Sequence, residues 1–124
     1  MIVLVIVNGT MVPEISIINS TSLPEVLTAH GNGIMKRVIA NKEIVPPVTQ
    51  LSLVDFQPGQ KVETHKHESM HEIYFVLNGT VTVNGRSVRK NECVIIPAQV
   101  EHDVANLTEE VVCWFAVAVA TGSS

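Results

Sequence analysis

The most constraining feature of this sequence is a succession of short segments rich in Val, Ile, Thr and Phe, which begins at Ile34 and continues almost to the C-terminus. Turn signals separate these segments, among them Pro58-Gly59, Asn78-Gly79, Asn84-Gly85 and Pro97. β-Branched and aromatic residues favour strands, whereas Gly, Pro and Asn favour the turns between them. The pattern therefore predicts an all-β fold with about eight strands.

Two local patterns predict particular elements. Asn84-Gly85 separates Thr80–Val83 from Arg86–Arg89, and Asn-Gly supplies the two positive φ angles that a tight type I′ turn requires. We therefore predict a β-hairpin whose register is set by this turn. At most one short helix near the N-terminus is expected, and the candidate is the stretch after Ser22, which can cap it, with Pro24 in the first turn.

The length of the chain predicts one domain, and its hydrophobic pattern predicts association with a second copy of the chain. A chain of 124 residues is too short for two ordinary domains, so we expect a single domain, residues 1–124, with a barrel over about residues 34–119. The segments 72–77 and 111–119 carry apolar residues on both faces of a strand, so both faces need cover. We expect a homodimer, with residues 1–33 at the interface and residues 1–7 available as an edge or exchanged strand.

Charge, the N-terminal segment and the cysteines exclude several classes of protein. The net charge is −4 and no basic stripe is present, so we expect no nucleic-acid partner. Residues 1–7 are apolar but far shorter than the roughly 20 residues of a membrane span, and no basic segment precedes them. We therefore expect no signal peptide, no membrane partner and a cytoplasmic location. Cys93 and Cys113 lie in apolar runs, which favours buried free thiols over a disulfide.

The chemically most informative segment is residues 65–72, in which three of the five histidines stand beside two glutamates. Residues two apart in a strand point the same way, so His65 and His67 present both imidazoles to one side. Glu72 begins the next predicted strand, and His102 opens a later one. Three neutral imidazoles and a carboxylate suit a divalent first-row metal and leave positions open to water or substrate. A closed structural zinc site usually needs paired thiolates, which the two separated cysteines do not supply.

The spacing Gly59-x5-His65-x-His67-x4-Glu72-x6-Gly79 resembles the first motif of the cupin family at every defining position. This resemblance, over about residues 48–119, implies a double-stranded β-helix, or jelly-roll barrel. It also implies one divalent transition metal bound inside the barrel by His65, His67, Glu72 and His102. The donor set leaves the metal open among Fe, Mn, Ni, Zn, Co and Cu.

The second cupin motif, Gly-x5-Pro-x-Gly-x2-His-x3-Asn, is matched in part. Pro97, His102 and Asn106 keep their places, whereas Asn91 and Gln99 stand where glycine is expected. Asparagine tolerates the left-handed backbone of a turn glycine, and glutamine adopts it less readily. The loop that leads to His102 is therefore where this sequence departs most from the family pattern.

The sequence leaves more than one role possible for residues near the expected ligands. Tyr74 shares the predicted inward face of Glu72, where its hydroxyl serves either as a catalytic acid or base or only as a satisfied core group. His71 precedes Glu72 on the same strand and should point away from the metal. His30 lies in a turn of Gly and Asn residues and is expected to be solvated.

Polar residues also interrupt other predicted strands. Asn106 shares the parity of His102 and is either a hydrogen-bonding neighbour of the ligands or a core residue. Arg37, Gln50 and Ser52 stand among apolar residues. If Arg37 faces inward it can hold a carboxylate in a bidentate grip, and if outward it is a solvated surface residue.

The resemblance favours an enzyme that uses the metal to bind and activate a small oxygenated substrate, such as an oxo acid, a hydroxy acid or a uronate-like sugar, by isomerase- or lyase-type proton transfer. An Fe(II)-dependent dioxygenase with the same site is a second possibility. The third is a non-catalytic module that binds or senses a metal or small ligand. A panel of candidate substrates, monitored by oxygen consumption and ultraviolet absorbance, distinguishes the three.

Overall fold

The expected all-β fold is confirmed. The computed structural model describes residues 4–13, 15–30 and 32–122, and two antiparallel sheets of six and four strands make up its body. Within these described ranges the one helical element is a 3-10 turn, Ser20–Ser22. No helix in the same ranges is long and apolar enough to cross a membrane.

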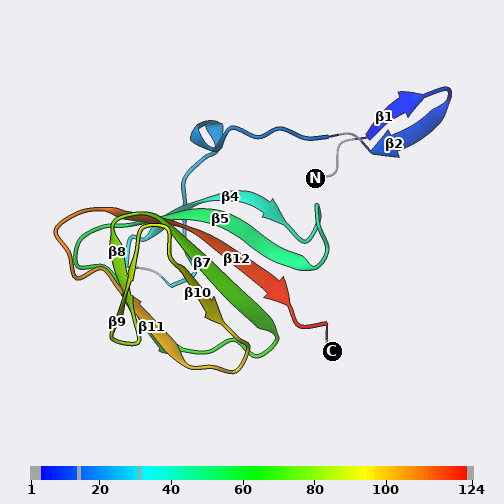
Figure 1. Cartoon of the computed structure of the whole chain (residues 1–124). Helices are drawn as coiled ribbons and strands as arrows, with labels where there is room; N and C mark the ends of the chain where they lie inside the picture. The colour runs from blue at the N-terminus through cyan, green and yellow to red at the C-terminus, as the bar shows by residue number, and fades with distance from the viewer. Residues whose placement is uncertain (1–3, 14, 31, 123–124) are drawn as a thin grey trace.

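The two sheets form the layers of the barrel (Figure 1). The larger sheet has the strand order β10-β7-β12-β5-β4-β3 and the smaller one the order β6-β11-β8-β9. The strands of the larger sheet are β3 (Val26–Leu27), β4 (Met35–Asn41), β5 (Val48–Phe56), β7 (Met70–Asn78), β10 (Cys93–Ile96) and β12 (Val112–Ala120). Those of the smaller sheet are β6 (Lys61–His65), β8 (Thr80–Val83), β9 (Arg86–Arg89) and β11 (His102–Ala105).

The core lies between the layers because alternate side chains of each strand point inward. Val54 and Phe56 of β5, Val76 of β7 and Trp114 of β12 are all buried there. The rings of Phe56 and Trp114 meet edge to face, with centroids 4.9 Å apart. Burying each large side chain contributes about 1.5–3 kcal/mol, so these strands hold the layers together.

The turn chemistry read from the sequence is confirmed. β8 and β9 form the expected hairpin, in register from Thr80 opposite Arg89 to Val83 opposite Arg86. Its turn residues have positive φ angles, 48° at Asn84 and 76° at Gly85. Between residues 35 and 120 the structure has nine strands, β4 to β12, against about eight expected from the pattern.

Within the described residues the limit of at most one short helix is confirmed, but the candidate stretch after Ser22 is not helical. Asn19 caps the short turn Ser20–Ser22 by accepting a hydrogen bond from the Thr21 backbone N–H, and the chain leaves the turn extended at Leu23. Leu23 precedes Pro24, whose ring disfavours helical backbone in the residue before it. The following residues, Val26–Leu27, pair as β3 with β4. The proline that suggested a helix start therefore ends the helical turn.

The described part of the N-terminal segment forms a hairpin of its own. β1 (Leu4–Val7) pairs with β2 (Thr10–Pro13) in a two-stranded hairpin, which lies away from both sheets in Figure 1. Residues 1–3 of the predicted strand lie outside the described residues. Exchange of this segment with a partner subunit remains a prediction.

The two cysteines are free, as expected, but Cys93 is not buried. Cys93 lies on β10, the edge strand of the larger sheet, and pairs with Phe75 on β7. Both side chains are on the face that points away from the core. Cys113 is partly buried. An apolar run indicates a strand, but it does not reveal which of its residues face the core.

Candidate metal centre

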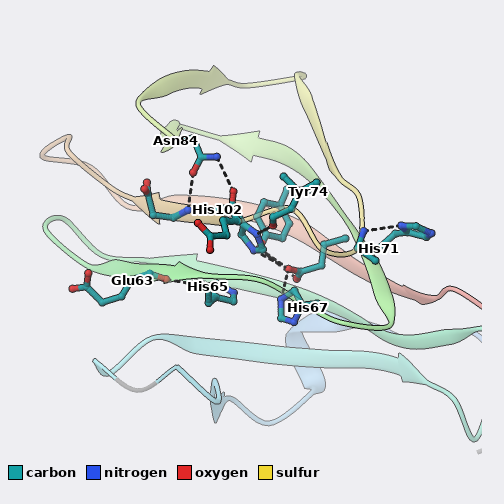
Figure 2. Close-up of polar contacts among 12 residues, drawn as sticks. Glu63, His65, His67, His71, Tyr74, Asn84 and His102 are labelled. Carbon is teal, nitrogen blue, oxygen red and sulfur yellow. Dashed lines mark hydrogen bonds and ion pairs between the residues drawn. The ribbon is translucent and has the colours of Figure 1, made fainter. Parts of the chain in front are cut away.

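His65, His67, Glu72 and His102 converge from both sheets. His65 ends β6 and pairs directly with His102, the first residue of β11, so the two imidazoles stand side by side on the smaller sheet. His67 lies in the connection from β6 to β7, and Glu72 on β7 approaches from the larger sheet. In Figure 2 the side chains of His65, His67 and His102 gather in the same region as that of Tyr74.

The ligand atoms of these four residues are close enough to share one ion. One nitrogen from each histidine and one Glu72 oxygen all lie within 4.8 Å of one another. Glu72 Oε1 is 2.7 Å from His67 Nε2 and 3.3 Å from His102 Nε2. Bonds of about 2.0–2.1 Å place two ligands on opposite sides of one metal ion roughly 4.2 Å apart, so the cluster needs to contract only slightly.

Backbone carbonyl groups orient two of the imidazoles. His65 Nδ1 lies 2.8 Å from the Glu63 carbonyl oxygen, and His102 Nδ1 lies 3.0 Å from that of Val100. A carbonyl oxygen can only accept, so each Nδ1 carries the proton and donates it. The Nε2 lone pairs then point toward the shared centre, which is the arrangement in which a second hydrogen bond prepares a histidine for a metal.

The three Nε2 atoms have no hydrogen-bond partner although all three are buried. The contacts of His67 and His102 with Glu72 are therefore close approaches without hydrogen-bond geometry. Leaving a buried polar atom unpaired costs about 1–3 kcal/mol. A divalent ion between these atoms removes that cost, so the residues present fit such an ion. Their nitrogen and oxygen donors do not select one first-row metal.

Tyr74 lies against the carboxylate of the cluster, on the inward face that its parity with Glu72 predicted. Its hydroxyl donates to Glu72 Oε1 and Oε2, each at 3.3 Å. Burial, reinforced by the negative charge of Glu72, raises the pKa of Tyr74 far above its ordinary value of 10.0. The hydroxyl therefore keeps its proton and acts as a donor.

The other two histidines, His71 and His30, lie outside the cluster of four. His71 points away from the cluster, as predicted, and its Nδ1 accepts a hydrogen bond from the Ala98 backbone N–H (Figure 2). His30 is exposed, as expected, but its ring lies 4.7 Å from that of His65 between centroids and lines a cavity. The ring is nevertheless partly removed from water, which lowers the pKa of His30, and the neighbouring His65 lowers it further. No sequence signal placed His30 there, because its turn meets His65 only in three dimensions.

The cavity beside the cluster has a volume of about 280 Å³. His67, Glu72 and Tyr74 form one part of its wall, and Lys36, Gln50 and Ser52 form another. The remaining lining side chains are mostly apolar, including Phe56 and Trp114. Ala116 and Ala118 of β12 also line the cavity, and their small side chains leave this space unfilled.

Arg37 is not the inward anion anchor that the sequence left open. It extends to Asp55, with 3.9 Å between Nη2 and Oδ2, and its Nη1 donates to the Ser20 carbonyl oxygen. Because side chains alternate along β4, the neighbouring Lys36 faces the cavity instead. Lys36 carried no signal of its own in the sequence, although strand alternation links its direction to that of Arg37.

Asn106 is a core residue and contacts none of the four cluster residues. It is fully buried, donates to the carbonyl oxygens of Phe56 and Glu110, and accepts from the backbone N–H and hydroxyl of Thr108. These bonds shape the turn after β11. Of the two roles left open for Asn106, the structure supports the core role.

The departures from the second motif keep the backbone that glycine would have adopted. Asn91 has a φ of 72° and Gln99 a φ of 73°. The Gln99 backbone N–H donates to the His67 carbonyl oxygen at 2.8 Å, so the loop before His102 is joined to the loop that carries His67. Gly79, the last residue of the first motif, also has a positive φ, and a Cβ there would lie 2.9 Å from Val112 Cγ2.

Comparisons with known proteins agree with this fold. A family model described as a cupin domain matches residues 52–118. A predicted oxalate decarboxylase from Thermotoga maritima is 19% identical over 85% of this chain and 99% of its own, with a TM-score of 0.75. KdgF from a Halomonas species is 18% identical, with coverages of 86% and 94% and a TM-score of 0.70. No curated protein matches this sequence.

A protein from Klebsiella pneumoniae with a double-stranded β-helix domain is 17% identical, with coverages of 90% and 95% and a TM-score of 0.68. Identities this low show a shared fold. The family match spans more than half of the chain and includes the residues that converge at the cluster. This chain belongs to the cupin domain family.

Proposed function

We propose that this chain is a metal-dependent enzyme that activates a small oxygenated substrate, such as an oxo acid, a hydroxy acid or a uronate-like sugar, by isomerase- or lyase-type proton transfer. His65, His67, Glu72 and His102 hold a divalent first-row metal. The observation that carries the proposal is the set of three buried, unpartnered Nε2 atoms around one carboxylate, at the wall of a cavity large enough for a small molecule.

The residues around the cavity have separate roles in this proposal. The metal, when bound, supplies Lewis-acid polarisation of a substrate oxygen. The carbonyl groups of Glu63 and Val100 hold two imidazoles in the ligating tautomer. Tyr74 keeps Glu72 in place, and its hydroxyl, which keeps its proton at the cavity wall, donates a hydrogen bond to a substrate oxygen as negative charge develops there. The apolar lining keeps bulk water away from that proton.

The direct test is elemental analysis of protein purified without added metal. We expect about one equivalent of a divalent metal in the natural chain and strongly reduced metal in His67→Ala. His71→Ala is the matched control, because His71 lies four residues away and points out of the cluster. Equal metal content in all three proteins would contradict the metal site.

A second experiment distinguishes an enzyme from a module that only binds a metal or ligand. Purified protein is screened against oxo acids, hydroxy acids and unsaturated uronates, with ultraviolet absorbance and oxygen consumption recorded together. Absorbance changes without oxygen uptake support the proposed proton-transfer chemistry, and oxygen uptake that depends on Fe(II) indicates a dioxygenase. Tight binding without turnover across the panel would contradict an enzymatic function and support a metal-binding or ligand-binding module.

A further inference from the structure

Lys36 is a cation on the cavity wall with an incomplete set of partners. Its ammonium group donates to Gln50 Oε1 at 2.6 Å. Among the residues that the structure describes, no carboxylate pairs with Lys36, whereas the neighbouring Arg37 pairs with Asp55. An ammonium group has three protons to donate, so Lys36 has donors left for a ligand.

A second donor on the same wall also lacks an acceptor. Trp114 lines the cavity and is 4% exposed, yet its indole Nε1–H has no hydrogen-bond partner. The backbones of Lys36, Val54 and Trp114 stand opposite one another on β4, β5 and β12, and the Lys36 side chain extends from this row to Gln50. The Trp114 N–H without any acceptor and the Lys36 ammonium with only one acceptor indicate that a missing partner supplies acceptor oxygens.

The sheet register sets the distance from this wall to the cluster. Gln50 on β5 lies opposite Ala118 on β12, and Ala118 lies opposite Glu72 on β7. Two strand spacings therefore separate the Gln50 and Glu72 backbones, about 10 Å. Only the methyl group of Ala118 stands between them on that row, which leaves room for one small molecule to reach both ends.

Electrostatics favour an anion in this position. Burial lowers the pKa of Lys36, because the charged ammonium is partly removed from water and its one described partner is a neutral amide. A carboxylate offers two acceptor oxygens and the opposite charge, and charge-assisted hydrogen bonds are about twice as strong as neutral ones. A phosphate calls for more donors than one ammonium and one indole.

We infer that Lys36, oriented by Gln50, binds a carboxylate of the substrate at the end of the cavity opposite the His/Glu cluster. This inference rests on the proposed function and narrows it. The substrate is a small acid that places its carboxylate at Lys36 and separate oxygen atoms at the cluster. Lys36 then selects acids over neutral molecules of the same shape.

The test compares two probes that differ only at the far end. 2-Oxoglutarate and 2-oxopentanoate share a 2-oxo acid group and a five-carbon chain, but only 2-oxoglutarate has a second carboxylate. Trp114 is the sole tryptophan and lines the cavity, so its fluorescence reports binding of either acid. Titrations use the natural chain, Lys36→Met, Lys36→Arg and the control Lys42→Met, which removes an exposed lysine from the turn after β4.

In the natural chain and in Lys42→Met we expect 2-oxoglutarate to bind about tenfold or more tightly than 2-oxopentanoate. Lys36→Met should weaken only 2-oxoglutarate and abolish this preference, and Lys36→Arg should restore part of it because the charge returns. Urea unfolding of each variant establishes that it is folded. A preference unchanged in Lys36→Met, an equal loss for both acids, or no binding of either acid would overturn the inference.

Repeating the titrations after removal of metal by a chelator separates this inference from the proposed function. If the Lys36-dependent preference for 2-oxoglutarate persists without metal, and metal increases the affinity for neither acid, the anion site is supported and the metal-dependent function is contradicted. If metal increases the affinity for both acids while Lys36→Met leaves the preference intact, the metal site is supported and the proposed role of Lys36 is wrong.

Discussion

The side-chain amide of Gln99 donates two hydrogen bonds to Glu68, one to its carbonyl oxygen and one to its carboxylate Oε2, each at 2.8 Å. Gln99 occupies a glycine position of the second cupin motif, and Glu68 follows His67 in the first. The residue that departs from the motif thus ties together the two loops that carry His67 and His102. Its side chain offsets the cost of its own left-handed backbone.

Gln99→Ala and Gln99→Gly test this balance. Alanine keeps the unfavourable positive φ and loses both side-chain bonds, so we expect a loss of about 1–2 kcal/mol in the free energy of unfolding. Glycine loses the same bonds but has no backbone penalty, so it should be more stable than the alanine variant by about 1 kcal/mol. Urea unfolding at neutral pH measures both changes. Equal stability of the two variants would show that backbone strain is not part of the balance.

Tyr74→Phe removes the hydroxyl that donates to Glu72 while keeping the ring in the core. We expect the metal affinity to fall about 10- to 100-fold, the usual effect of removing a group that holds a metal ligand in place. Competition with a fluorescent chelator measures this affinity. Because the ring still packs against Trp114, thermal stability should change little. An unchanged affinity would show that Tyr74 does not position Glu72.

The two thiols should differ sharply in reactivity. Burial, reinforced by the neighbouring Asp55, raises the pKa of Cys113 to about 11 from its ordinary value of 9.0, whereas Cys93 is exposed. At pH 8 we expect a thiol-specific chromogenic reagent to modify Cys93 quickly in folded protein and Cys113 only on unfolding. Cys93→Ser should remove the fast phase, and Cys113→Ser should leave it intact.

The raised pKa of Cys113 also gives a pH dependence of stability with a definite sign. The folded state binds the thiol proton more tightly than the unfolded state does. The resulting stability is fully present below pH 9.0 and is lost as the pH rises through about 11. Urea unfolding across this range should show a steeper decline in the natural chain than in Cys113→Ser. Identical slopes would contradict the assignment.

The expected homodimer is testable at the outer face of the larger sheet. Phe75 and Ile95 lie on adjacent strands on the face away from the core and are 39% and 70% exposed. We predict a mass of twice 13.5 kDa by light scattering after size exclusion, and a shift toward monomer in Ile95→Asp. Leu107→Asp, at an exposed loop position, is the control and should not change the mass. A monomeric natural chain would rule out the dimer.

Local patterns predicted the parts of this molecule that depend on neighbouring residues. Asn84-Gly85 requires positive φ angles, and the structure has them in the hairpin. The alternation of side chains along β7 correctly placed Tyr74 with Glu72 and turned His71 away. Local pattern misled at Pro24, because the same residue type is compatible with a helix start and with the end of a turn.

Sequence spacing by itself determined that His65, His67, Glu72 and His102 form a candidate donor set and that the chain folds as a cupin. Only the tertiary structure decided which of Lys36 and Arg37 faces the cavity, that the His30 ring lies beside that of His65, and that Cys93 is exposed. Alternation along a strand fixes which residues share a side, but the packing of one sheet on the other fixes which side is inside.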